Sequence, residues 1–183
     1  MNETLPLAEL RKLSYAEIEA LQNVRFKATA QCLLPEVPAY AQMFKEYSVD
    51  PKRLEKPEDW KTCGLPLISK RYYMKHVNEF VCQPKNPLKL FIAYTKYTEV
   101  EKTATLLLNV WNKETIAKEI KYYFNPQMPL FSGGTQSKRP TPVFITAKQK
   151  ENLTTGMKST IELVQQYIPK QKTIGMNLFP YGP

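Results

Sequence analysis

Histidine and cysteine are scarce in this sequence, and their scarcity excludes several kinds of site. One histidine and three cysteines occur in 183 residues. Cys32, Cys63 and Cys82 are widely spaced and form no CxxC pair, so they lack zinc-site spacing and are expected to be reduced thiols. His76 alone excludes histidine clusters but leaves a catalytic triad open. We therefore expect no metal site and little scope for metal-dependent hydrolysis.

Long apolar runs and targeting signals are also missing. The apolar runs are short, such as residues 106–108, whereas a bilayer-spanning helix needs about 20 apolar residues. The opening residues MNETLPLAELRK lack the basic head and apolar stretch of a secretion signal. The apolar fraction of 43% is nevertheless enough to build a core. We expect a folded cytoplasmic protein that does not span a membrane.

The net charge of +9 arises from 26 basic and 17 acidic residues, without a run of five like charges. Basic residues occur mostly singly or in pairs, a pattern typical of solvated helical surfaces. Because phosphates attract cations and exposed aromatic rings stack on bases, nucleic-acid binding stays open as an alternative. The scattered charges make nucleic acid the less favoured partner.

Capping signals predict helices in the first half of the chain. Ser14 and Glu17 have capping-box spacing and predict a helix over about 14–33. Pro38 suits the first turn of a second helix, which would complete a helical hairpin. Ser69 predicts the start of a further helix. Residues 1–87 are therefore expected to form a helical N-terminal section.

Residues 88–183 are expected to begin an α/β sheet subdomain. The run LKLFIAY predicts a strand over 88–94, and residues 103–111 read equally well as a strand or a buried helix. Asn112 predicts a helix that ends at Asn125-Pro126, and a strand follows at 143–146. Thr146 and Gln149 predict a capped, long amphipathic helix that ends before Pro169. The tail TIGMNLFPYGP predicts one more strand.

The loop SGGTQSKR has the composition of a phosphate cradle. Small residues let backbone N–H groups approach an anion, hydroxyls add donors, and lysine or arginine adds positive charge. The candidate phosphate-binding residues are Ser132, Gly133, Gly134, Thr135, Ser137 and Lys138, with Arg139 beside them. The loop fits neither GxxxxGK[ST] nor GxGxxG. A flexible polar turn is the alternative interpretation.

The same loop resembles the phosphate-binding motif of adenylate-forming enzymes, S-S/G-G-T-T-G-x-P. The second Thr-Gly of that motif is Thr135-Gln136 here, and Pro140 comes later than in the motif. Three N-terminal segments resemble the opening of phenylacetate-CoA ligase-like members of that superfamily: Val37-Pro38-Ala39-Tyr40, Ser48-Val49-Asp50-Pro51 and Leu65-Pro66-Leu67-Ile68-Ser69-Lys70. The resemblance covers about residues 14–82 and 131–183.

This resemblance implies the N-terminal part of an ATP-dependent ligase that forms an acyl-adenylate and then an acyl thioester. It implies a small-molecule carboxylate, ATP with Mg²⁺, and coenzyme A as an acceptor. Because the family's later motifs are not found and residue 183 ends an apolar, strand-like run, we expect an incomplete large domain. The fragment would be inactive by itself, with its missing C-terminal portion as a partner or a homodimer covering its apolar surface.

A stand-alone basic α/β module that binds nucleic acid or an acidic protein is the alternative function. The ligase interpretation predicts an exposed apolar sheet face or edge, whereas the alternative predicts a closed core and a continuous basic face. The other reactive residue types fit packing roles better than catalytic ones. His76 and the cysteines are expected to be satisfied or inert, and the tyrosine pairs 72–73 and 122–123 to pack with one ring inward.

Overall fold

A computed structural model describes residues 7–108, 112–132 and 140–165. The first part contains α1 (Leu7–Leu10), α2 (Tyr15–Ala28), the π-helix η1 (Thr29–Leu33), the 3₁₀ turn η2 (Leu34–Glu36), α3 (Pro38–Glu46), the 3₁₀ turn η3 (Pro51–Arg53), α4 (Pro57–Thr62), α5 (Lys70–Lys75) and the 3₁₀ turn η4 (Val77–Phe80). The second part contains α6 (Pro87–Thr98), α7 (Val100–Leu108), α8 (Lys113–Phe124), β1 (Pro126–Ser132), β2 (Thr141–Thr146) and α9 (Ala147–Gln165).

The predicted helix starts are confirmed. The Ser14 hydroxyl accepts a hydrogen bond from the Glu17 amide at 3.3 Å, and the Glu17 carboxylate accepts one from the Ser14 amide at 2.7 Å. Pro38 occupies the first turn of α3, and Ser69 caps α5 by accepting from the Tyr72 amide. Asn112 likewise caps α8. These starts follow from local sequence because each cap satisfies a backbone donor that has no partner inside its helix.

Two helices end in the same left-handed turn. After α3, Ser48 has φ 52°, the Ser48 amide donates to the Lys45 carbonyl, and the Val49 amide donates to the Phe44 carbonyl. After α4, Gly64 has φ 73° and makes the equivalent bond to Lys61. This is the Schellman arrangement, in which left-handed backbone favours glycine.

A first hydrophobic core lies within the N-terminal helical section. Its buried members are Ala30, Met43, Phe44, Val49, Leu54 and Leu65, and Trp60 packs against them. The three N-terminal segments that resemble the ligase opening each contribute to this core: Val49 and Leu65 are buried in it, and Tyr40 packs against it. The turns that interrupt the helices therefore place apolar side chains inward.

A second, smaller core joins α6 and α8. Phe91 and Tyr123 are its buried members, with ring centroids 4.9 Å apart in an edge-to-face arrangement. The buried hydroxyl of Thr103 donates to that of Thr95 at 2.7 Å, which links α7 to α6. Because α2 and η1 also contact α6, the helix that carries Phe91 packs against elements of the first core. The domain boundary between residues 87 and 88 stays a prediction.

The prediction of a strand over 88–94 is wrong, because this segment belongs to α6. Asn86 caps that helix by accepting from the Lys89 amide, and Pro87 occupies its first turn. The buried residues Leu90, Phe91, Thr95 and Thr98 recur at helical intervals. The Asn86 cap and the helical spacing of the buried residues over Pro87–Thr98 therefore outweigh the β-rich composition of 88–94. The segment 103–111 is helical in α7 as far as Leu108.

One antiparallel pair forms the sheet of the described residues. Strand β1 pairs with β2 from Pro126 opposite Thr146 to Ser132 opposite Thr141, with an irregularity near Pro126. Strand β2 confirms the strand expected at 143–146, whereas β1 was not predicted. Pro126 and Pro129 argue against a strand in the sequence, because proline is unfavourable in a strand except at edges and irregular positions.

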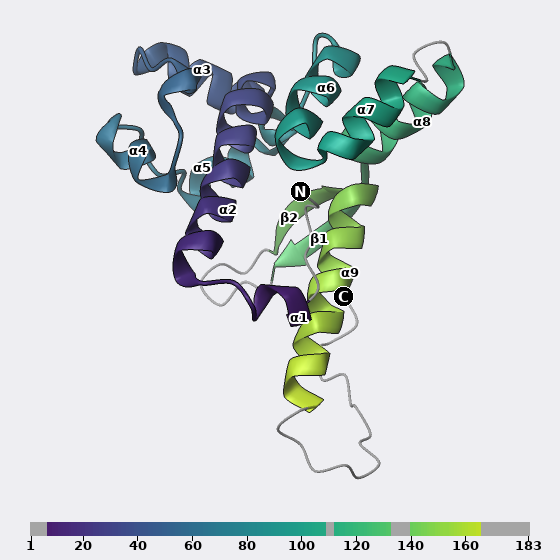
Figure 1. The fold of residues 1–183 in the computed structure, drawn as a ribbon. Coiled ribbons are helices and arrows are strands. Elements are labelled where there is room, and N and C mark those ends of the chain that lie inside the picture. The colour runs from purple at the N-terminus through teal and green to yellow at the C-terminus, as the bar shows by residue number, and fades with distance from the viewer. Residues whose placement is uncertain (1–6, 109–111, 133–139, 166–183) are drawn as a thin grey trace.

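Figure 1 shows α2 to α5 on one side of the molecule and α6 to α8 on the other, with the hairpin beneath them. Helix α9 begins at the hairpin and extends downward in the view, away from α6 and α7 (Figure 1). The described part is mainly helical with one small sheet, which agrees with a mixed α/β class. Within these residues, no helix combines the length and apolarity needed to cross a bilayer. The predicted tail strand lies outside the described residues.

Candidate functional site

The predicted phosphate-binding residues fall at the turn of the β1–β2 hairpin. Ser132 is the last residue of β1 and pairs with Thr141, the first residue of β2. Gly133, Gly134, Thr135, Ser137, Lys138 and Arg139 lie outside the described residues. The chain around them is nevertheless defined, because both strands that the segment connects are paired up to their ends.

Helix α9 follows β2 without a connecting loop. The Gln149 amide donates to the Thr146 hydroxyl at 3.2 Å, and the Thr146 amide donates to the Gln149 side-chain oxygen at 2.9 Å. This reciprocal pair confirms the capping box predicted at Thr146 and Gln149. Because the capping box joins the last residue of β2 to the first turn of α9, the helix starts directly at the end of the hairpin.

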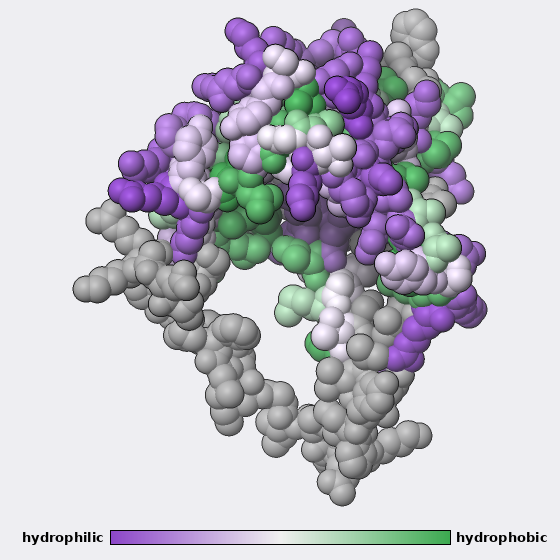
Figure 2. Space-filling model, turned by 90° about the vertical axis from the view of Figure 1, so that its left-hand side faces the viewer, coloured by the Kyte–Doolittle hydropathy of each residue, from purple (hydrophilic) through white to green (hydrophobic). Residues whose placement is uncertain are grey.

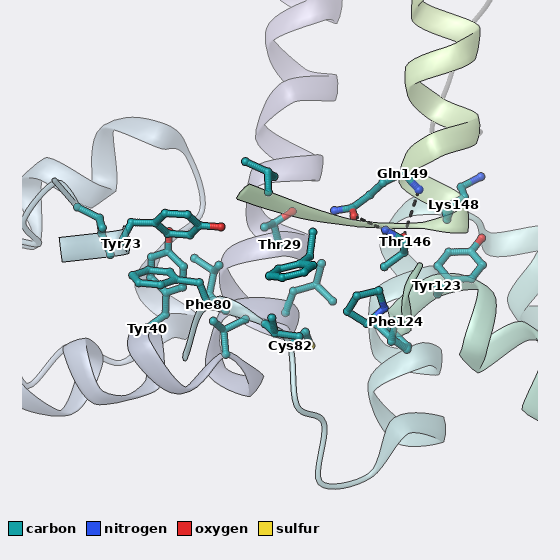
Figure 3. Close-up of a pocket in the computed structure, with 18 of the residues that line it drawn as sticks. Thr29, Tyr40, Tyr73, Phe80, Cys82, Tyr123, Phe124, Thr146, Lys148 and Gln149 are labelled. Atoms are coloured by element: carbon teal, nitrogen blue, oxygen red, sulfur yellow. Dashed lines mark hydrogen bonds between the residues drawn. The ribbon is translucent and has the colours of Figure 1, made fainter. Parts of the chain in front are cut away.

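A cavity of about 720 Å³ lies between the N-terminal helices and the hairpin. The space-filling view in Figure 2 shows hydrophobic residues gathered around a hollow beneath a mostly hydrophilic upper surface. The close-up in Figure 3 shows one aromatic group at each end, Tyr40, Tyr73 and Phe80 at one and Tyr123 and Phe124 at the other. Residues far apart in the sequence therefore line one half-open space.

The aromatic group formed by Tyr40, Tyr73 and Phe80 is packed mainly edge to face. Tyr40 and Phe80 have ring centroids 5.6 Å apart and planes at 88°, and Tyr73 and Phe80 lie 4.9 Å apart. Burial raises the pKa of Tyr40, and the neighbouring Tyr73 raises it further. Such ring pairs stabilise the wall beyond the area that they bury.

One hydrogen bond ties the helical section directly to the hairpin. The Tyr73 hydroxyl on α5 donates to the Pro142 carbonyl on β2 at 2.8 Å. Figure 3 shows Tyr73 pointing its hydroxyl toward the interior of the cavity region. This contact sets the width of the cavity at its tyrosine-rich end.

An ion pair lies at the other end. Lys148 Nζ is 3.1 Å from Glu99 Oε1, and their side chains are only 14% and 11% exposed. The ammonium group is also 5.8 Å from the centroid of the Tyr123 ring. The charge of Lys148 is thus matched by a carboxylate and by an aromatic face.

Thr141 is the polar lining residue with an unmet hydrogen-bonding group. Its side chain is buried, with the residue 8% exposed. Within the part of the chain that the structure describes, its Oγ1 has no hydrogen-bond partner. An unsatisfied buried hydroxyl is costly, and solvent does not offset the cost here, because less than 1 Å² of Oγ1 is accessible.

The thiols and the histidine behave as expected for satisfied residues. Burial, with a smaller contribution from Glu36, raises the pKa of Cys82 to about 11. Burial also raises the pKa of Cys32. His76 Nδ1 lies 2.9 Å from Glu79 Oε1, and its ring stacks on Tyr72. The raised thiol pKa values and the contacts of His76 agree with packing roles for Cys32, Cys82 and His76.

Sequence patterns did not identify the cavity. The tyrosine pairs were expected to serve only as packing residues, whereas Tyr73 and Tyr123 also line it. The aromatic residues that meet there come from α3, α5, η4 and α8. The sequence pattern does not show that these four elements meet. The tyrosine pairs at 72–73 and 122–123 are the only feature of the sequence that corresponds to the two walls.

The described residues contain no cluster of three His, Cys, Asp or Glu side chains suited to a metal ion. No protein-family model, curated protein or solved structure matches the chain.

Proposed function

We propose that these residues form the N-terminal part of an ATP-dependent ligase that activates a small carboxylate. In this reaction a carboxylate oxygen attacks the α-phosphorus of ATP, and pyrophosphate leaves. A thiol such as coenzyme A then attacks the acyl carbonyl, and AMP leaves. The chain's part is to bind the β- and γ-phosphates through Ser132, Gly133, Gly134, Thr135, Ser137 and Lys138.

The observation that carries the proposal is the placement of this segment between two paired strands, followed at once by a capped helix. The motif resemblance has the same order of loop, strand and helix. The donor set also suits a polyphosphate, since it combines backbone amides of small residues, hydroxyls and a lysine. We assign no protein ligand to Mg²⁺, which would enter with the nucleotide.

Exposed apolar side chains favour this proposal over a closed basic module. On α9, Leu153, Met157 and Ile161 are 49%, 66% and 54% exposed and recur every four residues. On β1, Phe131 is 62% exposed. A helix stripe and a sheet edge of this kind suit a surface that packs against more of a large domain.

A titration with MgATP tests the phosphate-binding step. We expect weak binding by the chain, and a loss of about tenfold in Lys138→Ala because a charge-assisted contact is removed. Lys158→Ala is the matched control, since that lysine lies on the exposed surface of α9. Gln136→Gly, which brings the loop nearer to the family's motif, should raise affinity. Equal affinity of all four proteins, or no binding at millimolar MgATP, would contradict the proposal.

The complete reaction should not occur in the 183-residue chain. An adenylation transition state needs charge stabilisation from several sides, and one loop with its bound metal supplies only part of it. We therefore expect no carboxylate-dependent exchange of pyrophosphate into ATP. Clear exchange by the purified chain would show that its residues do more than bind phosphate.

A further inference from the structure

A second groove, open to solvent, lies beside α6 and is also lined by the short helices η1 and η3. Its apolar residues are half-buried and form the floor: Leu88, Ile92 and Ala93 on α6 and Cys32 on η1. Burial raises the pKa of Cys32, so the thiol adds an uncharged surface. None of these residues lines the cavity beside the hairpin, and the groove is therefore a distinct surface.

Three exposed lysines surround this apolar floor, Lys52 on η3 and Lys89 and Lys96 on α6. Lys89 and Lys96 lie on one side of α6, about two turns or 10 Å apart along its axis, with Ile92 between them. Among the described residues that line the groove there is no carboxylate. Within the same part of the chain, none of the three lysines forms an ion pair. The groove thus joins apolar surface to unmatched positive charge.

The backbone that carries Lys52 is held in place by hydrogen bonds. The Gln31 side-chain amide on η1 donates to the Lys52 carbonyl at 2.9 Å and to the Leu54 carbonyl at 3.2 Å. The Lys52 amide donates to the Asp50 carboxylate at 2.9 Å, and the Leu54 side chain is fully buried. This side of the groove is therefore preorganised, which lowers the entropy lost when a partner binds.

The positive surface continues past Lys52 into an adjoining open groove. That groove adds basic and acidic residues, namely Lys27, Arg53, Lys56, Glu55 and Asp59. The Glu55 carboxylate is already paired with Lys27 at 2.6 Å. The Asp59 carboxylate accepts hydrogen bonds from the Glu55 and Lys56 amides at 2.8 and 3.0 Å. Both carboxylates are therefore engaged locally, and the charge of Lys52 and Arg53 stays available to a partner.

The combination of floor and charge favours a protein partner over nucleic acid. Nucleic acid binds through phosphate contacts and through stacking on aromatic rings. Tyr97, which is 37% exposed, is the one aromatic residue among the described residues that line the groove, and the aliphatic floor would stay unused. An amphipathic helix with acidic residues beside an apolar stripe would cover the floor and match the lysines at once.

We propose that the groove along α6 binds an acidic, amphipathic helix of a partner protein. Its apolar stripe packs on Leu88 and Ile92, and its carboxylates face Lys52, Lys89 and Lys96. This surface is separate from the phosphate loop, and the inference does not rest on the proposed ligase function.

A fluorescent helical peptide, about four turns long with glutamates flanking a leucine stripe, tests the charge complementarity. In anisotropy titrations with the full chain, we expect saturable binding that weakens as salt is added, because the lysines are exposed. The double variant Lys89→Glu/Lys96→Glu should weaken binding about tenfold or more. The variant Lys150→Glu/Lys158→Glu is the matched control, since it makes the same change in net charge at exposed positions of α9 and should keep the original affinity.

The apolar part of the contact is tested by a second pair of variants. Ile92→Ser should weaken peptide binding about fivefold, because the leucine stripe loses part of its floor. Ile161→Ser, at a position of α9 that is 54% exposed, should leave the affinity unchanged. A peptide with lysines in place of its glutamates should not bind.

Equal losses within either matched pair of variants, or no binding of the acidic peptide, would overturn the proposal. So would tighter binding of a thymidine oligonucleotide with the same net charge as the peptide, which would assign the surface to nucleic acid. Because the peptide contains no phosphate, its failure to bind would leave the MgATP prediction intact.

Discussion

The Tyr73 hydroxyl donates a hydrogen bond to the Pro142 carbonyl across 69 residues of sequence, at 2.8 Å. This bond joins α5 of the helical section to β2 of the hairpin. The cavity and the β1–β2 hairpin are therefore mechanically connected, because a shift of β2 relative to α5 would change both.

Removal of this bond should loosen the hairpin. Tyr73→Phe is expected to lower the free energy of unfolding by about 1 kcal/mol, since a half-buried carbonyl loses its donor. Urea denaturation would measure the change, and hydrogen exchange in β2 should increase. Tyr72→Phe is the control, because that neighbouring tyrosine is exposed. Equal effects of the two substitutions would show that the bond does not stabilise the hairpin.

Ser48 and Gly64 both have left-handed backbone, so glycine should stabilise the protein at the first position and alanine should destabilise it at the second. Ser48→Gly should stabilise the protein by about 1 kcal/mol, because it relieves a residue with φ 52°. Gly64→Ala should destabilise it by about 1 kcal/mol. A Cβ at Gly64 would meet no atom within 4 Å, so the cost is conformational and not steric. Thermal unfolding of both variants checks the pair, and the same sign of change in both would contradict it.

Cys82 should react slowly with alkylating reagents. At pH 8 a thiol whose pKa is about 11 instead of 9.0 has roughly a hundredfold less thiolate. Iodoacetamide labelling followed by peptide mass spectrometry should therefore be at least that much slower in the folded chain than in denaturant. Similar rates in both states would disprove the assigned burial.

The raised pKa of Cys82 also predicts that the protein loses stability at alkaline pH. The folded protein retains the Cys82 proton longer than the unfolded chain, so its stabilising contribution is complete below pH 9 and is lost between pH 9 and 11. The raised pKa values of Tyr40 and Tyr73 add a further loss above pH 10. Urea denaturation from pH 8 to 10.5 should show a smaller loss in Cys82→Ala, and identical slopes would contradict the linkage.

The capping box at the start of α9 should stabilise the element that follows the hairpin. Thr146→Ala is expected to cost about 1 kcal/mol, because the Gln149 amide loses its acceptor. Thr154→Ala, within the same helix, should be neutral or slightly stabilising, since alanine is the better helix former. Circular dichroism during urea denaturation would compare them. A larger effect at Thr154 would show that the cap contributes little.

Local signals predicted the helix starts well and the strands poorly. Ser14, Ser69, Asn112 and Thr146 each cap a helix through a bond to a residue three positions away, so neighbouring sequence contains all the required information. The composition of 88–94 favours a strand, but its aromatic and apolar residues also suit the buried helix face that they form in α6. The prolines of β1 argue against a strand until its pairing with β2 is known.

The sequence alone determined the helix starts at Ser14, Pro38, Ser69 and Asn112 and the capped helix after β2. Each depends on residue type and short spacing. Tertiary structure alone decided that Tyr40, Tyr73, Phe80 and Tyr123 share one cavity, and that the Tyr73 hydroxyl reaches the Pro142 carbonyl. The physical reason is that burial and long-range contacts depend on how separate elements pack, which local periodicity does not specify.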